Sequence, residues 1–138
     1  IAPFASIVRD PDAYERFGEV ILTHTCREKA ELQYGFDVVA AAKADILVGE
    51  DASEKLVHFA STTREETAHM GRITTLIETG GLFDALGEPP FDPEHDRVMI
   101  CGSMAMLQDL KAIFEAKGFE EGANNKPGSF VIERAFVG

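Results

Sequence analysis

The chain has 138 residues, 45% of them hydrophobic and 27% charged, a composition typical of one globular domain. Its 24 acidic and 13 basic residues give a formal net charge of −11, which repels phosphate backbones and argues against a nucleic-acid-binding protein. No apolar run approaches the roughly 20 residues that a membrane-spanning helix needs, so we expect no membrane span. The two cysteines, Cys26 and Cys101, lie too far apart to suggest a disulfide framework or a metal cluster, and we expect a cytoplasmic location.

The first nine residues predict a helix that is already in progress at the start of the sequence. Pro3 suits a first turn, because the N–H that proline lacks would have no partner there. A natural chain rarely begins inside an element. We therefore expect residues 1–138 to be one domain from the C-terminal part of a longer protein, ending in a short tail at residues 135–138.

Strands and helices alternate along the remaining sequence. Asp10 can cap and Pro11 can start a short helix, and the apolar, β-branched run after it predicts a strand buried on both faces. The expected strands are 19–25, 56–60, 97–101 and 130–133, and the expected helices are 11–17, 28–44, 74–79 and 104–117. This alternation predicts an α/β fold with a doubly wound sheet of parallel strands.

Helical spacing also predicts which side chains face the core, and where a helix stops. Gly118 is placed to end the last long helix in a left-handed conformation. Residues 46–49 fit either a helix end or a turn. The residues expected on buried faces are Leu32, Phe36, Val39 and Ala40 in the first long helix, Met104, Leu107, Leu110 and Phe114 in the last, and the methionines Met99 and Met106.

Polar residues follow three of the predicted strands, at the end where parallel α/β sheets bind their ligands. The first strand ends in Thr-His-Thr-Cys-Arg at 23–27, the second in Ser-Thr-Thr-Arg at 61–64, and the third in Cys-Gly-Ser at 101–103. Hydroxyls, arginines and a glycine turn are the donors that a phosphorylated ligand needs. The sequence therefore indicates a phosphate-binding site at these strand ends.

A purely structural interpretation of the same residues stays open. Thr63 and Glu66 fit a capping box, which would need no ligand. Arg64 and Arg72 could pair with neighbouring acids in so acidic a chain. Cys101 follows an apolar strand, where a thiol is more often an inert core group than a nucleophile. The four histidines share no zinc-type spacing.

Taken together, five segments resemble the bacterial ferredoxin–NADP⁺ reductases, in order and with similar gaps along the whole chain. They are Ile1-Ala2-Pro3-Phe4, Thr23-His24-Thr25-Cys26-Arg27, Thr63-Arg64-Glu65-Glu66, Val98-Met99-Ile100-Cys101-Gly102-Ser103, and the ending Val131-Ile132-Glu133-Arg134-Ala135-Phe136-Val137-Gly138. The resemblance implies a Rossmann-like NADP(H)-binding domain. It also implies an N-terminal FAD-binding β-barrel and a first strand with a Gly-Thr-Gly turn, neither of which is found among these residues.

The resemblance further implies a role for individual residues. Arg64 and Arg72 would hold the 2′-phosphate of NADP(H) with Thr63, while Thr23 and Arg27 would line the nucleotide near its phosphates and ribose. The reacting centre would include Cys101, Glu133 and Ala135, with Gly102 and Ser103 shaping the floor beneath the nicotinamide. The tail residues implied to cover the flavin side are Phe136, Val137 and Gly138.

The function implied by this resemblance is that of a ferredoxin or flavodoxin–NADP⁺ reductase. Such an enzyme passes a hydride between NADP(H) and FAD, and single electrons between FAD and ferredoxin or flavodoxin. Two alternatives stay open: the reductase component of an oxygenase system, and a non-catalytic nucleotide-binding module. Nucleic acid and membrane partners are not expected.

Overall fold

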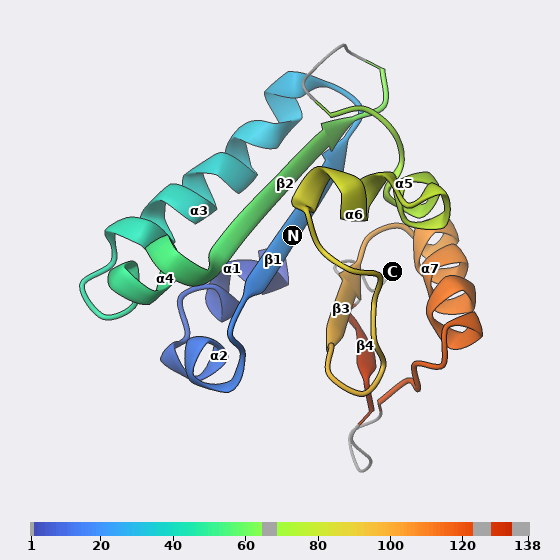
Figure 1. Cartoon of the computed structure of the whole chain (residues 1–138). Helices are drawn as coiled ribbons and strands as arrows, with labels where there is room; N and C mark the ends of the chain where they lie inside the picture. Colours follow the sequence, from blue (N-terminus) through green and yellow to red (C-terminus); the bar gives the residue numbers. More distant parts are fainter. Residues whose placement is uncertain (1, 65–68, 123–127, 134–138) are drawn as a thin grey trace. The chain divides into compact units, whose positions relative to one another are not determined.

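The computed structural model describes residues 2–64, 69–122 and 128–133 (Figure 1). The chain divides into two compact units, residues 1–73 and residues 74–138. Each unit contains one pair of parallel strands, β1 with β2 and β3 with β4. The expected α/β class with parallel strands is confirmed, and among the described residues its ladders form two separate two-stranded sheets.

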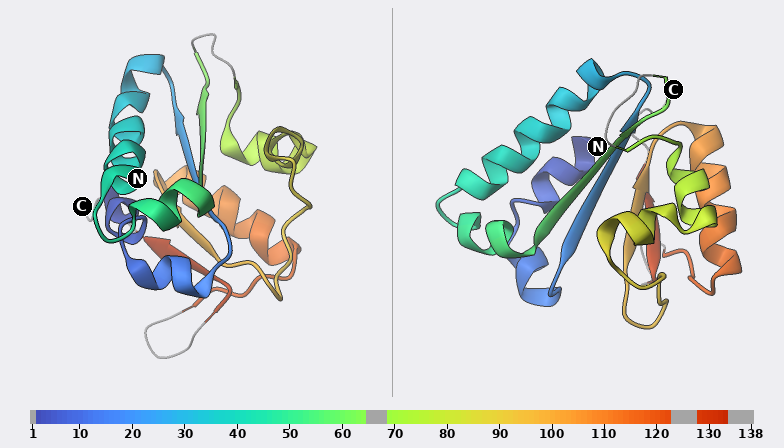
Figure 2. Two further views of the ribbon diagram at one scale, coloured as in Figure 1. Left: turned by 60° about the vertical axis from the view of Figure 1, so that its left-hand side comes forward. Right: turned by 45° about the horizontal axis from the view of Figure 1, so that its top comes forward.

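Unit 1 begins with two short helices and then runs through one βαβ crossover. Its elements are α1 (Ala2–Ile7), α2 (Pro11–Arg16), β1 (Val20–Cys26), the 3-10 helix η1 (Lys29–Leu32), α3 (Gln33–Ala44), α4 (Gly49–Lys55) and β2 (Leu56–Thr62). The capping expected for the second helix is confirmed, since Oδ1 of Asp10 accepts a bond of 3.0 Å from the backbone N–H of Asp12. Helix α3 lies along one face of the β1–β2 pair (Figures 1 and 2).

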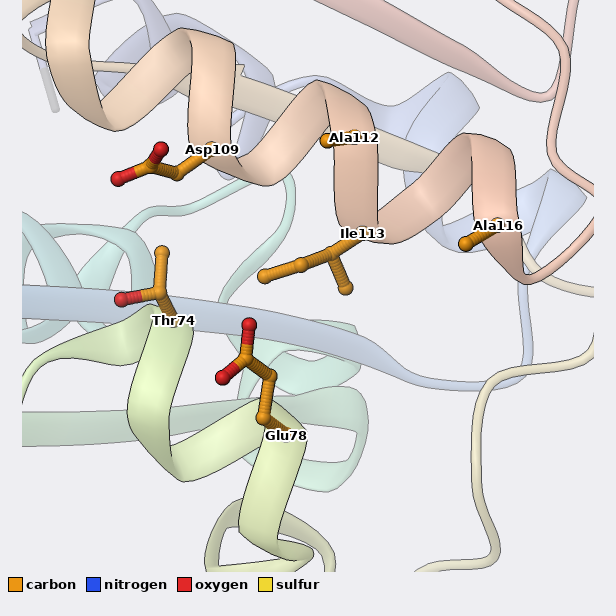
Figure 3. Close-up of a pocket in the computed structure, with 6 residues that line it drawn as sticks. All are labelled: Thr74, Glu78, Asp109, Ala112, Ile113 and Ala116. Carbon is orange, nitrogen blue, oxygen red and sulfur yellow. The ribbon is translucent and has the colours of Figure 1, made fainter.

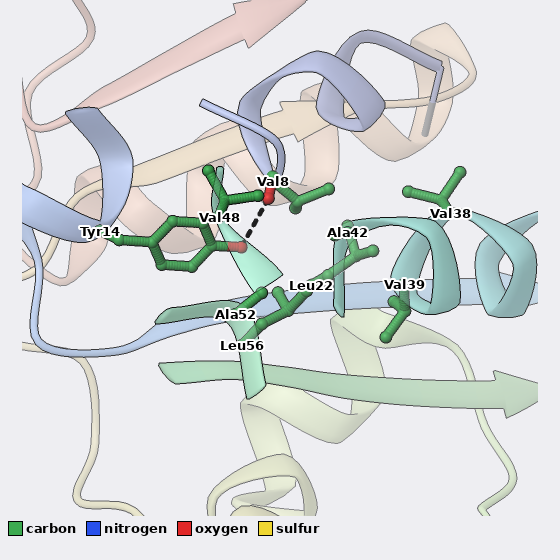
Figure 4. Packing of buried hydrophobic residues seen from close by; sticks show 9 residues of the cluster. All are labelled: Val8, Tyr14, Leu22, Val38, Val39, Ala42, Val48, Ala52 and Leu56. Carbon is green, nitrogen blue, oxygen red and sulfur yellow. Dashed lines mark hydrogen bonds between the residues drawn. The ribbon is translucent and has the colours of Figure 1, made fainter. Parts of the chain in front are cut away.

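The core of unit 1 is almost entirely aliphatic (Figure 4). Its largest member, Tyr14, is 1% exposed, and its hydroxyl donates a hydrogen bond of 2.6 Å to the backbone oxygen of Val8. That bond satisfies the polar end of a side chain whose ring is buried. The other residues of the cluster are Val8, Leu22, Val38, Val39, Ala42, Val48, Ala52 and Leu56.

Two of the four core residues predicted around helix α3 are buried, Leu32 and Val39, and two are not. Phe36 and Ala40 are exposed, and the buried positions are Gly35, Val38, Val39 and Ala42. The reason is the close approach of the helix to β1 at Gly35, where a Cβ atom would lie 2.5 Å from Nδ1 of His24. Phe36 then lies outside the core, with its ring edge-on to His58 at a centroid distance of 5.1 Å.

Helix α4 is absent from the sequence-based expectation because its sequence, Gly-Glu-Asp-Ala-Ser-Glu-Lys, carries little hydrophobic periodicity. Only Gly49 and Ala52 are buried within it. The preceding turn is held by Asp45, whose Oδ1 accepts bonds from the backbone N–H groups of Leu47 at 2.8 Å and Val48 at 3.2 Å. These bonds lower the pKa of the Asp45 carboxyl, and its bond from Arg9 adds to the effect.

Unit 2 is built around aromatic rings. Its elements are α5 (Ile73–Thr79, starting at the last residue of unit 1), α6 (Gly81–Leu86), β3 (Val98–Cys101), α7 (Met104–Ala116) and β4 (Phe130–Glu133). Phe91 lies in the proline-rich loop and packs against rings from the rest of the unit. The ring centroids of Phe83, Phe91, Phe114, Phe119 and Phe130 lie 4.7–6.4 Å from their neighbours.

The expected end of α7 at Gly118 and most of its expected buried face are confirmed, whereas the expectations for Met99 and Met104 are wrong. Oγ of Ser103 caps the helix by accepting a bond of 3.3 Å from the N–H of Met106, and Gly118 follows the helix with a left-handed φ of 94°. Leu107, Leu110 and Phe114 form the buried face as expected. However, Met104 is 54% exposed and Met99 is 37% exposed, because both residues lie outside the aromatic cluster that forms this core.

Candidate functional site

The carboxyl ends of β1 and β2 lie side by side, with Cys26 opposite Thr62 as the last pair of the ladder. The two segments that follow these strands stay paired beyond the ladder. The N–H of Thr63 donates to the backbone oxygen of Cys26 at 3.0 Å, and the N–H of Arg64 donates to that of Arg27 at 2.9 Å. The structure therefore brings together three of the predicted site residues, Arg27, Thr63 and Arg64.

Arg64 and Arg72 lie on either side of the segment 65–68, which is outside the described residues. This segment includes Glu66 of the expected capping box. The chain returns toward β2 after this segment, since the N–H of Thr62 donates to the backbone oxygen of His69 at 3.2 Å. The side chains of Arg64 and Arg72 are exposed, and within the described residues neither makes an ion pair. Both guanidinium groups are thus available to an anion, and the alternative of pairing with described acids is not supported.

Arg27 and Thr23 differ from this pair. Nε of Arg27 lies 3.8 Å from Oε1 of Glu31, a long contact between two exposed side chains. Exposed pairs of this kind contribute little, about 0–1 kcal/mol, so Arg27 can exchange Glu31 for another anion. Thr23 is half-buried and lies opposite Phe59, three residues before the end of β1.

A histidine–cysteine contact in β1 has no counterpart in the sequence-based expectation. Nε2 of His24 lies 3.2 Å from Sγ of Cys26. Burial lowers the pKa of His24 to about 4, and burial raises the pKa of the Cys26 thiol, with Glu31 adding to the rise. At neutral pH the pair is therefore a thiol beside a neutral imidazole. This is not the thiolate–imidazolium arrangement of a cysteine nucleophile.

The second set of predicted residues lies in unit 2, where β3 leads into α7. Cys101 is half-buried, Gly102 forms the turn, and Ser103 caps the helix. A Cβ at Gly102 would lie 2.6 Å from Cε of Met106, so a larger residue would need that side chain to move. Cys101 is the register partner of Glu133 in the β3–β4 ladder. Ala135, Phe136, Val137 and Gly138 lie outside the described residues.

Two acidic features of unit 2 do not resemble a phosphate site. A shallow groove between α5 and α7 is lined by Thr74, Glu78, Asp109, Ala112, Ile113 and Ala116 (Figure 3). Its carboxylates would repel a phosphate. The exposed group of Asp92, Glu94 and His95 is held together by loop contacts, among them a bond of 2.6 Å between Nδ1 of His95 and Oδ2 of Asp92. That contact raises the pKa of His95 and lowers the pKa of Asp92.

The described helices are all too short or too polar to cross a lipid bilayer. The parallel strand pairs and the arginines beyond β1 and β2 define an α/β protein of the Rossmann-like type. No protein-family model matches the sequence.

Individual proteins, however, match the whole length of this chain. The chain is 51% identical over 138 residues to a flavodoxin/ferredoxin–NADP reductase of Rhodobacter capsulatus, covering 100% of this chain and 51% of that protein. It is 48% identical over 138 residues to ferredoxin–NADP reductase A of Sorangium cellulosum, covering 100% of this chain and 50% of that protein. The predicted resemblance is confirmed: the chain is a relative of the bacterial ferredoxin–NADP reductases from end to end.

The fold agrees with this relationship. A crystal structure of a ferredoxin NADP⁺ reductase from Neisseria gonorrhoeae, with bound FAD and NADP, matches 99% of this chain at a TM-score of 0.81 and 27% identity. The match covers 52% of the Neisseria chain. The present chain thus spans about half the length of the relatives that it matches.

Proposed function

We propose that this chain binds NADP(H) and forms the nicotinamide-nucleotide part of a flavin-dependent ferredoxin or flavodoxin–NADP⁺ reductase. One observation carries the proposal. Arg64 and Arg72 present exposed guanidinium groups, without an ion pair among the described residues, beyond parallel strand ends in a chain related throughout to such reductases. The relatives' names specify both the nucleotide and the electron carriers.

The local chemistry of unit 1 fits a phosphorylated nucleotide. The formal net charge is −11, and within the described residues the guanidinium groups of Arg64 and Arg72 make no ion pair. The planar guanidinium group matches phosphate oxygens in a bidentate manner, which a lysine cannot do. We assign the 2′-phosphate to Arg64 and Arg72 with the hydroxyl of Thr63, and the remaining phosphates and ribose to Arg27 and Thr23.

In unit 2 the proposal assigns contact with the nicotinamide to Cys101, Gly102 and Ser103. Gly102 lets the side chain of Met106 pack closely against its backbone, since a Cβ there would lie 2.6 Å from Cε of Met106. Glu133, the register partner of Cys101, is assigned to the neighbourhood of the reacting atoms. Ala135 is assigned to contact with the flavin, and Phe136, Val137 and Gly138 to the tail over it.

When bound, the nicotinamide and flavin together supply hydride transfer and its division into single electrons. The residues of this chain bind and orient the nucleotide and exclude water from it. None of them needs to act as an acid or base, which agrees with the neutral state of His24 and the protonated state of Cys26. We propose that FAD is held mostly by residues outside this chain, and that the protein acts in the cytoplasm.

The test is to mix the complete gene product with NADPH or NADH and follow flavin absorbance in a stopped-flow instrument. Ferredoxin or flavodoxin is then added as the electron acceptor. We expect rapid flavin reduction by NADPH, much slower reduction by NADH, and reoxidation by either one-electron carrier. A protein without bound flavin would indicate a non-catalytic nucleotide-binding module. A flavoprotein that passes electrons only to an oxygenase component would indicate the other alternative.

A further inference from the structure

Two hydroxyls, a half-buried one and a buried one, connect the end of β1 with the chain that returns after residue 68. Thr25 and Ser61 are register partners in the β1–β2 ladder, and their hydroxyl oxygens lie 2.8 Å apart. Oγ of Ser61 also lies 3.2 Å from the backbone oxygen of Gly71, the residue directly before Arg72. Ser61 is 0% exposed, so its hydroxyl makes these bonds out of contact with solvent.

The direction of both hydrogen bonds follows from the number of protons. A carbonyl oxygen can only accept, so Ser61 uses its one hydroxyl proton on Gly71. The hydroxyl of Thr25 must then donate to Oγ of Ser61. The result is a relay in which Thr25 donates to Ser61 and Ser61 donates to Gly71. Ser61 takes part in both bonds, whereas Thr25 takes part in one.

Backbone contacts fix the same returning segment. The N–H of Gly71 donates to the backbone oxygen of Thr62 at 3.0 Å, and the N–H of Thr62 donates to that of His69 at 3.2 Å. The ring of His69 stacks on the buried ring of Phe59 at a centroid distance of 4.6 Å. Gly71 has a φ of 121°, a conformation that other residues rarely adopt, and it sets the direction in which the chain enters Arg72.

We infer that Ser61 is a positioning residue for NADP(H): its hydroxyl holds the backbone of Gly71 so that Arg72 is oriented toward the 2′-phosphate before the nucleotide arrives. This inference rests on the proposed function, and it adds a residue that does not itself touch the nucleotide. An exposed arginine loses side-chain and backbone freedom when it binds a phosphate. Fixing the backbone beforehand reduces that loss, so the hydroxyl relay contributes to affinity.

The inference predicts a graded loss of affinity for the 2′-phosphate alone. Ser61→Ala removes both bonds and should weaken binding about 3- to 10-fold, the loss expected for one net hydrogen bond. Thr25→Val removes only the upstream bond and should weaken binding about 2-fold. Thr25→Ser keeps the hydroxyl and should bind like the unchanged protein.

The experiment measures, by calorimetric titration of the complete gene product, the Kd for adenosine 2′,5′-bisphosphate and for AMP. The two probes differ by the 2′-phosphate. Val39→Ala is the matched control, because Val39 lies in the core of the same unit and its truncation lowers stability without touching the relay. Arg64→Ala and Arg72→Ala are measured beside it as a test of the phosphate site itself.

We expect Ser61→Ala to raise the Kd for the bisphosphate and to leave the Kd for AMP unchanged. Val39→Ala should change neither Kd. If Arg72→Ala weakens the bisphosphate but Ser61→Ala and Thr25→Val do not, the inference is wrong and the proposed function stands. If the arginine variants also leave the bisphosphate unaffected, the phosphate site fails and the positioning role fails with it. Should Ser61→Ala not fold, the contrast between Thr25→Val and Thr25→Ser decides the question.

Discussion

The two strand pairs end in different chemistry, although both are parallel and both lead into loops of predicted function. At the ends of β1 and β2 stand arginines and hydroxyls, groups that can bind an anion by charge and directed hydrogen bonds. At the end of β3 stand a half-buried thiol, a glycine and a helix cap, to which we assign contact with the nicotinamide. We therefore propose that unit 1 selects the nucleotide and that unit 2 places its reactive end.

The cores differ in the same way. Unit 1 is held by aliphatic side chains around one hydrogen-bonded tyrosine, and unit 2 by a cluster of phenylalanine rings. A large ring contributes more on burial than an aliphatic side chain, so unit 2 depends more heavily on single residues. Substitutions in the core of unit 2 should therefore mainly lower stability, whereas substitutions of the arginines of unit 1 should mainly change nucleotide selection.

The largest effect is expected in the aromatic cluster. Phe114 is 2% exposed and contacts the rings of Phe91, Phe119 and Phe130. Phe114→Ala should lower the free energy of unfolding by about 3–5 kcal/mol, the usual cost of deleting a buried ring. Denaturant unfolding measures the loss, and hydrogen exchange should place it in unit 2. Protection that falls equally in unit 1 would contradict the division into two cores.

An intermediate effect is expected from pH, with opposite signs in the two units. Burial lowers the pKa of His24 to about 4 in the folded chain, below the value of about 6.5 when unfolded. Stability from His24 is thus complete above pH 6.5 and is lost as the pH falls toward 4. Allowing for its partial exposure, we expect a loss of about 2 kcal/mol. In unit 2 the carboxylate of Asp92 raises the pKa of His95. The contribution of His95 to stability is therefore present at low pH and is lost as the pH rises.

The measurement is the free energy of unfolding between pH 4 and 8 for His24→Gln and His95→Gln. The first change should flatten the acid side of the profile, after allowance for the carboxylates that titrate in both proteins. The second should leave the acid side between pH 4 and 6.5 as steep as before. An unchanged acid slope in His24→Gln would show that His24 is not buried as a neutral side chain.

The smallest of these effects concerns the contact of α3 with β1. Replacing glycine by alanine inside a helix ordinarily stabilises it by about 1 kcal/mol. At Gly35 the added Cβ would lie 2.5 Å from Nδ1 of His24, so we expect Gly35→Ala to destabilise the protein by about 1–2 kcal/mol. Gly18 is the control, because a Cβ there would meet nothing within 4 Å. A gain in thermal stability for Gly35→Ala would refute the close approach.

The same contact shows why sequence patterns place some elements and not others. The strands were predictable because β-branched runs have few other stable forms, and Ser103 and Gly118 mark helix ends by local geometry alone. Phe36 and Ala40 of α3 were wrongly predicted as buried because Gly35 brings the helix close to β1 without any hydrophobic signal. Helix α4 was missed because its burial rests on a glycine and an alanine.

The candidate site likewise contains residues that could be predicted from the sequence and residues that could not. Arg27, Thr63 and Arg64 could be grouped from the sequence, because parallel strands must end at the same edge. The roles of Thr25, Ser61 and Gly71 could not be predicted, since they depend on a backbone oxygen that returns from beyond residue 68. A pattern of residue types carries no information about such a contact. The protonation states of His24 and Cys26 likewise depend on burial, which lowers the pKa of His24 and raises the pKa of Cys26.

The central claim, that unit 1 selects the nucleotide through its arginines, is tested most directly by kcat/KM for NADPH and NADH in the complete gene product. Arg64→Ala and Arg72→Ala each remove charged hydrogen bonds that contribute about 1.5–3 kcal/mol, so the NADPH value should fall about 10- to 100-fold. The NADH value should change far less. Arg9→Ala, which removes an exposed arginine paired with Asp45 at 3.2 Å, should change neither. A ratio of NADPH to NADH efficiency that stays the same in both site variants would contradict the account.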